Sequence, residues 1–482
     1  MLGISQYIPF VGRGIGISKL APFIIYGFSF LCALISLFLP IVGVFFLFPL
    51  IPYQILVEKL RPLFLGKDIN DIVLVCILIG TFFQASRSWA GKKPDPNLPF
   101  QLKFFIFISI VAFGVGLVTL RESLAINNLY VMKWKEYITF PLIWILTVKN
   151  IQTKKQILMM IGLMTLGILG VDYYFRNNLE WMNVWHYTNR AKTLMNDMGL
   201  FGSLGANHYG AFFAHFVFIF VGLFLFVKRP LAKLALLGSI IFTIYCLLYS
   251  FSRGAYFGVL AGLVFIGIVK DKRIFVLLII CFLFWRQLLP ISVVERVEMT
   301  QDETGELDVS AAERLGYWDN AIGLFVVSPV LGHGFYSFEY FTGRDAHNVY
   351  FKLLAEQGVL GLIALLCVFQ IAFLKGWRLY RKSKDWLYQG LGLGLTACIV
   401  SIIVTNMFGD RWSYLPLNAY FWVLFRLVVR AEAIESELVT NPGLTADKKR
   451  KPRGRGIKEE QNRPSVRLVK QNKIEAGLNR QK

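Results

Sequence analysis

The chain has 482 residues, of which 56% are hydrophobic and 17% are charged, and its mean hydropathy is +0.55. A soluble globular chain carries about 25% charged residues. The composition therefore excludes a disordered chain, a collagen-like chain and an ordinary cytosolic enzyme. It predicts a polytopic membrane protein, in which lipid surrounds most of the apolar surface. The net charge of +21 does not indicate a nucleic-acid partner, because cytoplasmic loops of membrane proteins are rich in Lys and Arg.

Apolar stretches near the length that spans a bilayer, roughly 20 residues, recur along the whole chain. They predict an all-α, polytopic membrane helix bundle with about 12–14 transmembrane helices and one large external loop that contains short helices. The candidate spans are residues 22–38, 41–57, 72–86, 104–120, 130–148, 156–173, 209–227, 231–251, 255–269, 274–291, 359–374, 388–407 and 415–429.

This pattern divides the chain into five regions. We expect an N-terminal segment (1–20), a transmembrane bundle (21–291), a large loop (292–358), C-terminal transmembrane helices (359–430) and a basic, disordered tail (431–482). The N-terminal segment lacks the pattern of a cleavable signal peptide. The six cysteines lie within apolar stretches without ligand spacing, so we interpret them as buried hydrophobic residues.

The distribution of charge predicts an orientation. Basic residues concentrate at 228–229, 270–273, 375–384 and in the tail, and these segments should be cytoplasmic. The loop 292–358 carries eleven acidic and four basic residues, opposite in sign to the chain as a whole. We therefore expect this loop on the external side and the tail in the cytoplasm. The side of the N-terminus stays open.

Three clusters carry residues suited to chemistry. The first is Tyr-Ser-Phe-Ser-Arg-Gly-Ala-Tyr at 249–256, where Arg253 lies at the outer ends of two helices joined by almost no loop. Either this arginine reaches the lipid headgroups, or it is a fixed cation that awaits an anion. The second begins with Ser-Ala-Ala-Glu at 310–313, a capping box that predicts a helix ending at Ser328-Pro329. Arg314 lies in its first turn, and the alternative is a surface helix with Arg314 paired to an acid.

The third cluster is the segment 343–358. Asp345 is a good N-cap and Gly358 a good C′ residue, which places His347 and Asn348 in the first helical turn. The positive end of a helix favours an anion and keeps imidazole neutral. The alternative is a capping or packing histidine. A weaker cluster runs from Arg190 to His208, in which Asn207 either enters the bundle or caps a helix.

The order of these motifs resembles the O-antigen ligase and O-antigen polymerase superfamily of bacterial inner membranes. The matching pieces are Ser-Arg-Gly, Ala-Ala-Glu-Arg-Leu, Ser-Pro-Val-Leu-Gly-His-Gly-Phe and His-Asn-Val-Tyr-Phe-Lys-Leu-Leu-Ala-Glu-Gln-Gly, within residues 199–374. The resemblance implies that Arg253 and Arg314 hold a donor diphosphate and that His347 activates or positions the acceptor. It further implies that Asn207, Asn348 and Arg190 bind substrate.

Members of this superfamily transfer a glycan from an undecaprenyl-diphosphate carrier to an acceptor hydroxyl on the periplasmic side. The resemblance thus implies a ligase whose partners are the lipid-linked saccharide, an acceptor glycan or lipid, membrane lipids and other membrane proteins of polysaccharide assembly. The sequence has no Asp-x-Asp motif, and we expect neither a metal nor a cofactor. A polymerase, which differs only in its acceptor, and a bicarbonate or solute transporter are the alternatives.

Overall fold

The computed structural model describes residues 21–53, 69–87, 98–125, 128–179, 205–298 and 309–440. Every regular element within these ranges is a helix. The chain divides into two compact units, Met1–Ser436 and Glu437–Lys482. The predicted N-terminal segment, Arg190 and the tail beyond Thr440 lie outside the described residues.

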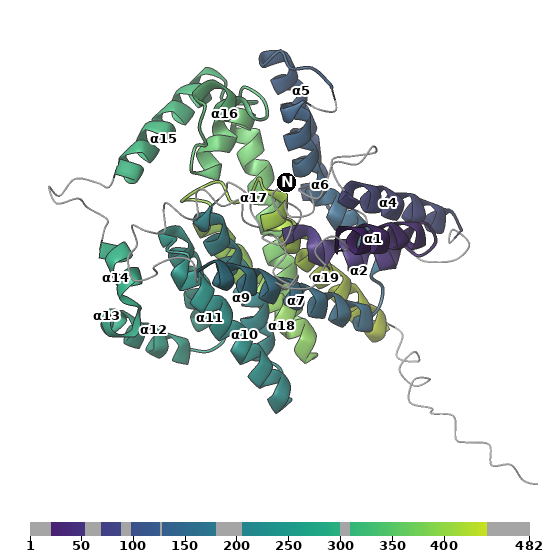
Figure 1. Cartoon of the computed structure of the whole chain (residues 1–482), viewed down its shortest axis with the longest axis vertical. Coiled ribbons are helices and arrows are strands. Elements are labelled where there is room, and N and C mark those ends of the chain that lie inside the picture. Colours follow the sequence, from purple (N-terminus) through teal and green to yellow (C-terminus); the bar gives the residue numbers. More distant parts are fainter. Residues whose placement is uncertain are drawn as a thin grey trace, which may run out of the picture. The chain divides into compact units, whose positions relative to one another are not determined.

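The helices follow one another with short connections (Figure 1). In chain order they are α1 (Ala21–Phe38), α2 (Pro40–Leu50), η3 (Ile51–Tyr53), α4 (Ile69–Arg87), α5 (Phe100–Thr119), α6 (Leu129–Asn150), α7 (Lys154–Leu179), α9 (Ala206–Phe224), α10 (Pro230–Tyr249), α11 (Arg253–Val269), α12 (Arg273–Leu283), α13 (Trp285–Leu288), α14 (Ile291–Glu298), α15 (Val309–Val327), α16 (Ser337–Thr342), α17 (Val349–Lys382), α18 (Trp386–Thr405) and α19 (Leu415–Thr440).

Many of these helices are long and apolar enough to cross a membrane. Six described helices reach that length and composition, and five shorter apolar helices accompany them. Each span predicted from the sequence overlaps one of the described helices. The prediction of an all-α, polytopic membrane bundle is therefore confirmed.

The centre of the bundle is built on close helix contacts. Helix α9 packs against α10, α11 and α18 (Figure 1). At the contact with α18, a side chain at Gly222 would lie 2.3 Å from the carbonyl oxygen of Gly390. Small residues allow membrane helices to approach this closely. The same principle brings α17 to α18, where Gly376 faces Gly392.

The last helix, α19, is the most enclosed part of the C-terminal region. Its residues from Leu417 to Val428 are at most 1% exposed. The hydroxyl of Tyr420 donates to the carbonyl oxygen of Pro49 in α2 (2.7 Å), and Arg426 lies over the ring of Trp144 in α6 (4.6 Å). This helix therefore joins the N-terminal helices to the rest of the bundle.

Candidate functional site

Helix α17 changes direction at Gly358, where φ is 62° and ψ is −164°. This backbone interrupts the helical hydrogen bonds, and a neighbouring segment, residues 328–335, supplies replacements. The carbonyl oxygen of Glu356 accepts from the N–H of Gly334 (2.7 Å), and the N–H of Val359 donates to the carbonyl oxygen of Pro329 (2.8 Å). Gly358 thus has the left-handed φ expected of a C′ residue, and the helix that begins at Val349 is interrupted there, as predicted. A second helical stretch follows directly, so the whole element α17 extends to Lys382.

The start of α17 also differs from the expectation. Its N-cap is Asn348, whose Oδ1 accepts from the backbone N–H groups of Tyr350 (2.9 Å) and Phe351 (3.3 Å). Asp345 instead accepts from the N–H of His347 (3.3 Å), within a turn that precedes the helix. The prediction of Asp345 as the cap, with His347 and Asn348 in the first turn, is therefore wrong. Asp and Asn cap equally well, so local sequence did not separate the two positions.

The turn that follows α18 joins the starts of two other helices. The amide nitrogen of Asn348 donates to the carbonyl oxygen of Met407 (3.2 Å). On the neighbouring helix α11, a side chain at Gly254 would lie 2.6 Å from Cβ of Phe408. Arg253, the first residue of α11 and half-buried, is therefore held beside the same turn as the start of α17.

His347 occupies a strained position between these elements. Its φ of 51° lies in the left-handed region, which residues with a side chain rarely adopt, and such strain is concentrated at functional sites. Nδ1 of His347 lies 3.5 Å from Oδ2 of Asp345. The ring centroids of His347 and of Tyr317 in α15 are 6.0 Å apart. Burial lowers the pKa of His347; Asp345 opposes this shift, while the charges of Arg314 and Arg411 add to it. The imidazole is therefore neutral near neutral pH.

A buried ion pair lies behind Asp345. Nζ of Lys352 is 2.9 Å from Oδ2 of Asp410 and 3.8 Å from Oδ1 of Asp345. Lys352 and Asp410 are 8% and 0% exposed. Burial opposes ionisation of Asp410, but the Lys352 ammonium and hydrogen bonds from Ser413 outweigh it and lower the pKa of this carboxyl. The position of Asp345, and with it that of His347, thus depends on a charged cluster inside the protein.

Helix α15 brings Arg314 to this cluster. The helix ends before Ser328-Pro329, as the proline predicted, but it begins at Val309, so that Ser310 of the predicted capping box lies within its first turn. Trp318 stacks on Phe351 of α17 with ring centroids 5.4 Å apart. Arg314 is the sixth residue of the helix, in its second turn rather than its first, and its charge reaches both His347 and Arg411.

The remaining predicted site residues are placed differently. Asn207 is exposed and lies in the first turn of α9. The N-cap of this helix is Gly205, with φ of 71°, so the interpretation of Asn207 as the cap is wrong. Asn348 is 6% exposed, and both its amide atoms make the contacts given above. Arg190 lies outside the described residues.

Sequence reasoning missed the connection between α18 and α19. The segment Gly-Asp-Arg-Trp-Ser at 409–413 contributes Asp410 and Arg411 to the surroundings of His347. A charged pair between two long apolar stretches was the available signal.

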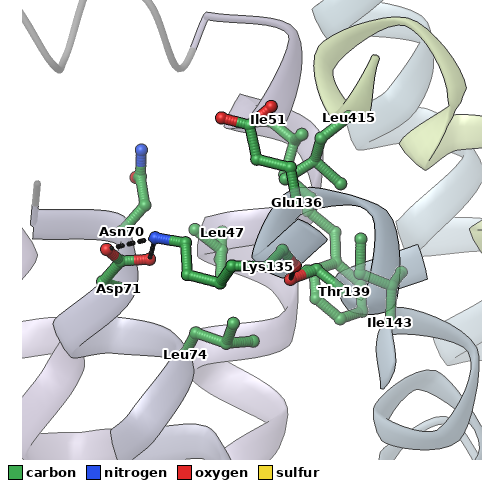
Figure 2. A pocket seen from close by; sticks show the side chains of 11 residues that line it. Leu47, Ile51, Asn70, Asp71, Leu74, Lys135, Glu136, Thr139, Ile143 and Leu415 are labelled. Carbon is green, nitrogen blue, oxygen red and sulfur yellow. Dashed lines mark hydrogen bonds and ion pairs between the residues drawn. The ribbon is translucent and has the colours of Figure 1, made fainter. Parts of the chain in front are cut away.

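A separate small hollow of about 30 Å³, open to the surface, lies beside α6 (Figure 2). Its polar rim includes the ion pair of Asp71 and Lys135 (2.8 Å). Apolar side chains of α2, α4 and α6 form most of the remaining wall, together with Ile51 of η3 and Leu415 of α19. On the other side of α6, Lys133 pairs with Glu339 of α16 (3.1 Å). The helix therefore separates the hollow from the segment that carries α16.

The geometry at His347 suits the transfer of a group from an anionic carrier. A neutral imidazole can accept a proton, and guanidinium groups bind phosphate oxygens in a bidentate manner. The cluster draws on α11, α15, α17 and the turn after α18, so a helical scaffold positions each group.

Comparison with known proteins supports this interpretation. Residues 238–366 match the family model described as O-Antigen ligase. That range contains Arg253, Arg314, His347 and Asn348, whereas the connection that carries Arg411 lies beyond it. No curated protein matches the chain. The match supports the predicted resemblance to the O-antigen ligase superfamily, and it assigns an O-antigen ligase domain to residues 238–366 of this multi-pass membrane protein.

Proposed function

We propose that the protein is a ligase-type glycosyltransferase of the bacterial inner membrane. It moves a glycan from a polyprenyl-diphosphate carrier to an acceptor hydroxyl, a lipid core or a growing polysaccharide, on the periplasmic side. The observation that carries the proposal is a strained histidine, His347, in the turn directly before α17. Burial lowers its pKa, and the charge of Arg314 on α15 lowers it further. A polymerase differs only in taking a growing chain as its acceptor.

His347 receives the acceptor proton in this mechanism. The carboxylate of Asp345, 3.5 Å from Nδ1, favours the tautomer that carries its proton on Nδ1 and leaves Nε2 as the acceptor. As the acceptor oxygen bonds to the anomeric carbon, its proton passes to Nε2. General-base assistance of this kind contributes roughly 10²–10⁴-fold to the rate.

Arginines stabilise the leaving group. The bond between the anomeric carbon and the phosphate oxygen breaks, and its electron pair leaves with the diphosphate. The added negative charge is neutralised by Arg253 and Arg314, whose planar groups match phosphate oxygens. Lysine keeps the charge but not this geometry, so Arg253→Lys should transfer poorly.

The test measures donor binding and glycan transfer separately for His347→Ala, Arg253→Ala and Arg314→Ala. The donor is the lipid-linked saccharide pool extracted from the cells that produce the protein. His347→Ala should bind donor but lose at least about 100-fold in transfer, whereas the arginine variants should lose donor binding as well. Near-normal transfer in any two of the three contradicts the shared site.

Two controls complete this test. Arg378→Ala removes an arginine that is 53% exposed and pairs with Glu432 (3.4 Å), and it should transfer normally. Excess EDTA should leave transfer intact, because arginines supply the positive charge in the proposed mechanism. Loss of turnover that magnesium or manganese restores would refute that part of the proposal.

A further inference from the structure

Arg411 is fixed in place by its backbone. Its N–H donates to Oδ1 of Asn406 (3.0 Å), and its carbonyl oxygen accepts from the side-chain amide of Asn418. The residue is 6% exposed. A side chain at Gly409 would lie 2.5–3.0 Å from the guanidinium atoms, so glycine at that position leaves the space that Arg411 fills.

The guanidinium makes its direct hydrogen-bond contact with a histidine. Nη1 of Arg411 lies 2.8 Å from Nε2 and 3.1 Å from Nδ1 of His208, in the first turn of α9. His208 is 7% exposed. Its ring packs edge-on against that of Tyr414, with the ring centroids 4.9 Å apart. Arginine has no acceptor atom, so His208 accepts this bond in its neutral form. The contact orients Arg411 without neutralising its charge.

The nearby carboxylates are engaged elsewhere. Asp345 and Asp410 attract the guanidinium, yet no carboxylate in the described ranges lies within 4 Å of it. Asp410 pairs with Lys352, and Asp345 lies between Lys352 and His347. A buried cation without a direct counter-ion is costly, and in membrane proteins such groups mark functional sites.

Arg411 also lies close to another cation. The charges of Arg411 and Arg314 act on each other, and both lower the pKa of His347. Two guanidinium groups held near each other repel, and an anion that binds both relieves that repulsion. The free protein thus holds positive charge beside His347 that a bound diphosphate would compensate.

We propose that Arg411 is a further diphosphate-binding residue and that His208 is its positioning residue. This inference rests on the proposed function and adds a contact from the connection between α18 and α19, outside the matched domain. Arg411 approaches the diphosphate from α18 while Arg314 approaches from α15, so the leaving group is held from two sides.

Inorganic pyrophosphate is the probe, because it carries the charge of the leaving group without the lipid or the glycan. Its dissociation constant is measured by calorimetry on the full chain in detergent. We expect Arg411→Ala to weaken pyrophosphate binding by about tenfold or more, the loss of roughly one charge-assisted contact. Arg411→Lys should fall between wild type and Arg411→Ala. Gly409→Ala, which crowds the guanidinium, should weaken binding while the arginine is retained.

His208 is tested through the kinetics of transfer. His208→Gln should raise the donor KM several-fold and leave the acceptor KM unchanged, a split that general loss of folded protein does not produce. The matched control for Arg411→Lys is Arg426→Lys, which makes the same substitution at another buried arginine, the one that lies over the ring of Trp144. It should bind pyrophosphate as tightly as wild type.

The outcomes separate the two proposals. If Arg314→Ala weakens pyrophosphate binding but Arg411→Ala and Arg411→Lys bind it within twofold of wild type, the role of Arg411 is refuted and the proposed function stands. If the wild-type protein neither binds pyrophosphate nor transfers glycan, the proposed function fails and this inference fails with it.

Discussion

Two lysine–aspartate pairs in this protein have nearly the same length and different surroundings. The pair of Lys352 and Asp410 beside His347 is 2.9 Å long, with side chains 9% and 0% exposed. The pair of Lys135 and Asp71 at the rim of the hollow in Figure 2 is 2.8 Å long, with side chains 44% and 25% exposed. Distance alone makes them equivalent. The comparison shows that burial determines how much each pair contributes to stability and whether it affects the candidate site.

The exposed pair keeps most of its contact with solvent, which screens the attraction, and such pairs contribute about 0–1 kcal/mol. The buried pair has paid for desolvation, so each ion depends on the other. It also touches Asp345 and through it His347. The buried pair of Lys352 and Asp410 therefore affects both the stability of the fold and the proposed chemistry at His347. The exposed pair of Lys135 and Asp71 has no such link to His347.

The largest expected effect comes from breaking the buried pair. Lys352→Met leaves Asp410 charged and without its ammonium, and we expect a loss of about 3–5 kcal/mol of unfolding free energy. Lys135→Met should change stability by about 0–1 kcal/mol. Unfolding in a denaturing detergent, followed by tryptophan fluorescence, measures both. Equal losses in the two variants would remove the distinction drawn from burial.

Removing both partners sharpens the comparison. Lys352→Met combined with Asp410→Leu replaces the buried ions with apolar groups, and such replacements are often neutral for stability. We expect the double variant to recover most of the stability lost in Lys352→Met. Glycan transfer should stay low, because Asp345 loses the neighbour at 3.8 Å that helps to place it. Full recovery of transfer would show that the pair serves the fold alone.

A smaller effect is expected at two asparagines. Asn348→Ala removes the N-cap of α17 and the bond to Met407, and loss of a cap costs about 0.5–2 kcal/mol. Asn207→Ala, at an exposed position without a capping role, should unfold like wild type. Thermal unfolding of the two variants in the same detergent tests this. A destabilised Asn207→Ala would mean that the start of α9 depends on a contact not described above.

The subtlest effect concerns pH. The pKa of His347 lies below its ordinary value of 6.5 because burial, Arg314 and Arg411 lower it more than Asp345 raises it. Transfer needs the neutral base, so activity should decline as pH falls through this lowered pKa. Arg314→Gln removes a lowering charge and should move the acidic limb to higher pH. Asp345→Asn removes the raising charge and should move it to lower pH, and kcat/KM measured against pH detects both.

Much of the fold was predictable because membrane spans depend on local hydrophobicity. Each apolar stretch became a helix, and only residues 250–252 separate α10 from α11, which begins at Arg253. The start of α17 was not predictable. Asn348 prevails over Asp345 as the cap where its amide also reaches Met407, a contact 59 residues away. The interruption at Gly358 was predictable, but the second helical stretch that follows it directly was not, because residues 328–335 replace the lost hydrogen bonds.

The residues of the candidate site likewise divide into those that the sequence predicts and those that only the structure reveals. Arg314 and His347 belong to recognisable motifs, and in the structure the charge of Arg314 lowers the pKa of His347. Arg411 belongs to no such motif, and only the packing of the connection after α18 against α9 reveals it. Arg253 reaches the same region through the contact of Gly254 with Phe408, which no local pattern encodes.

The bend in α17 also limits how much of this helix a membrane has to enclose. A straight helix of 34 residues would be about 51 Å long, far more than the hydrocarbon thickness of about 30 Å. The part beyond Gly358, residues 359–382, is about 36 Å long by the same rise, enough to cross the bilayer with a modest tilt. The remaining arm, residues 349–357, is about 13 Å long and is released from the span by the bend. Lys352 therefore need not enter the hydrocarbon, and under the proposed function the cluster around His347 would lie at the level where a lipid carrier presents its phosphates.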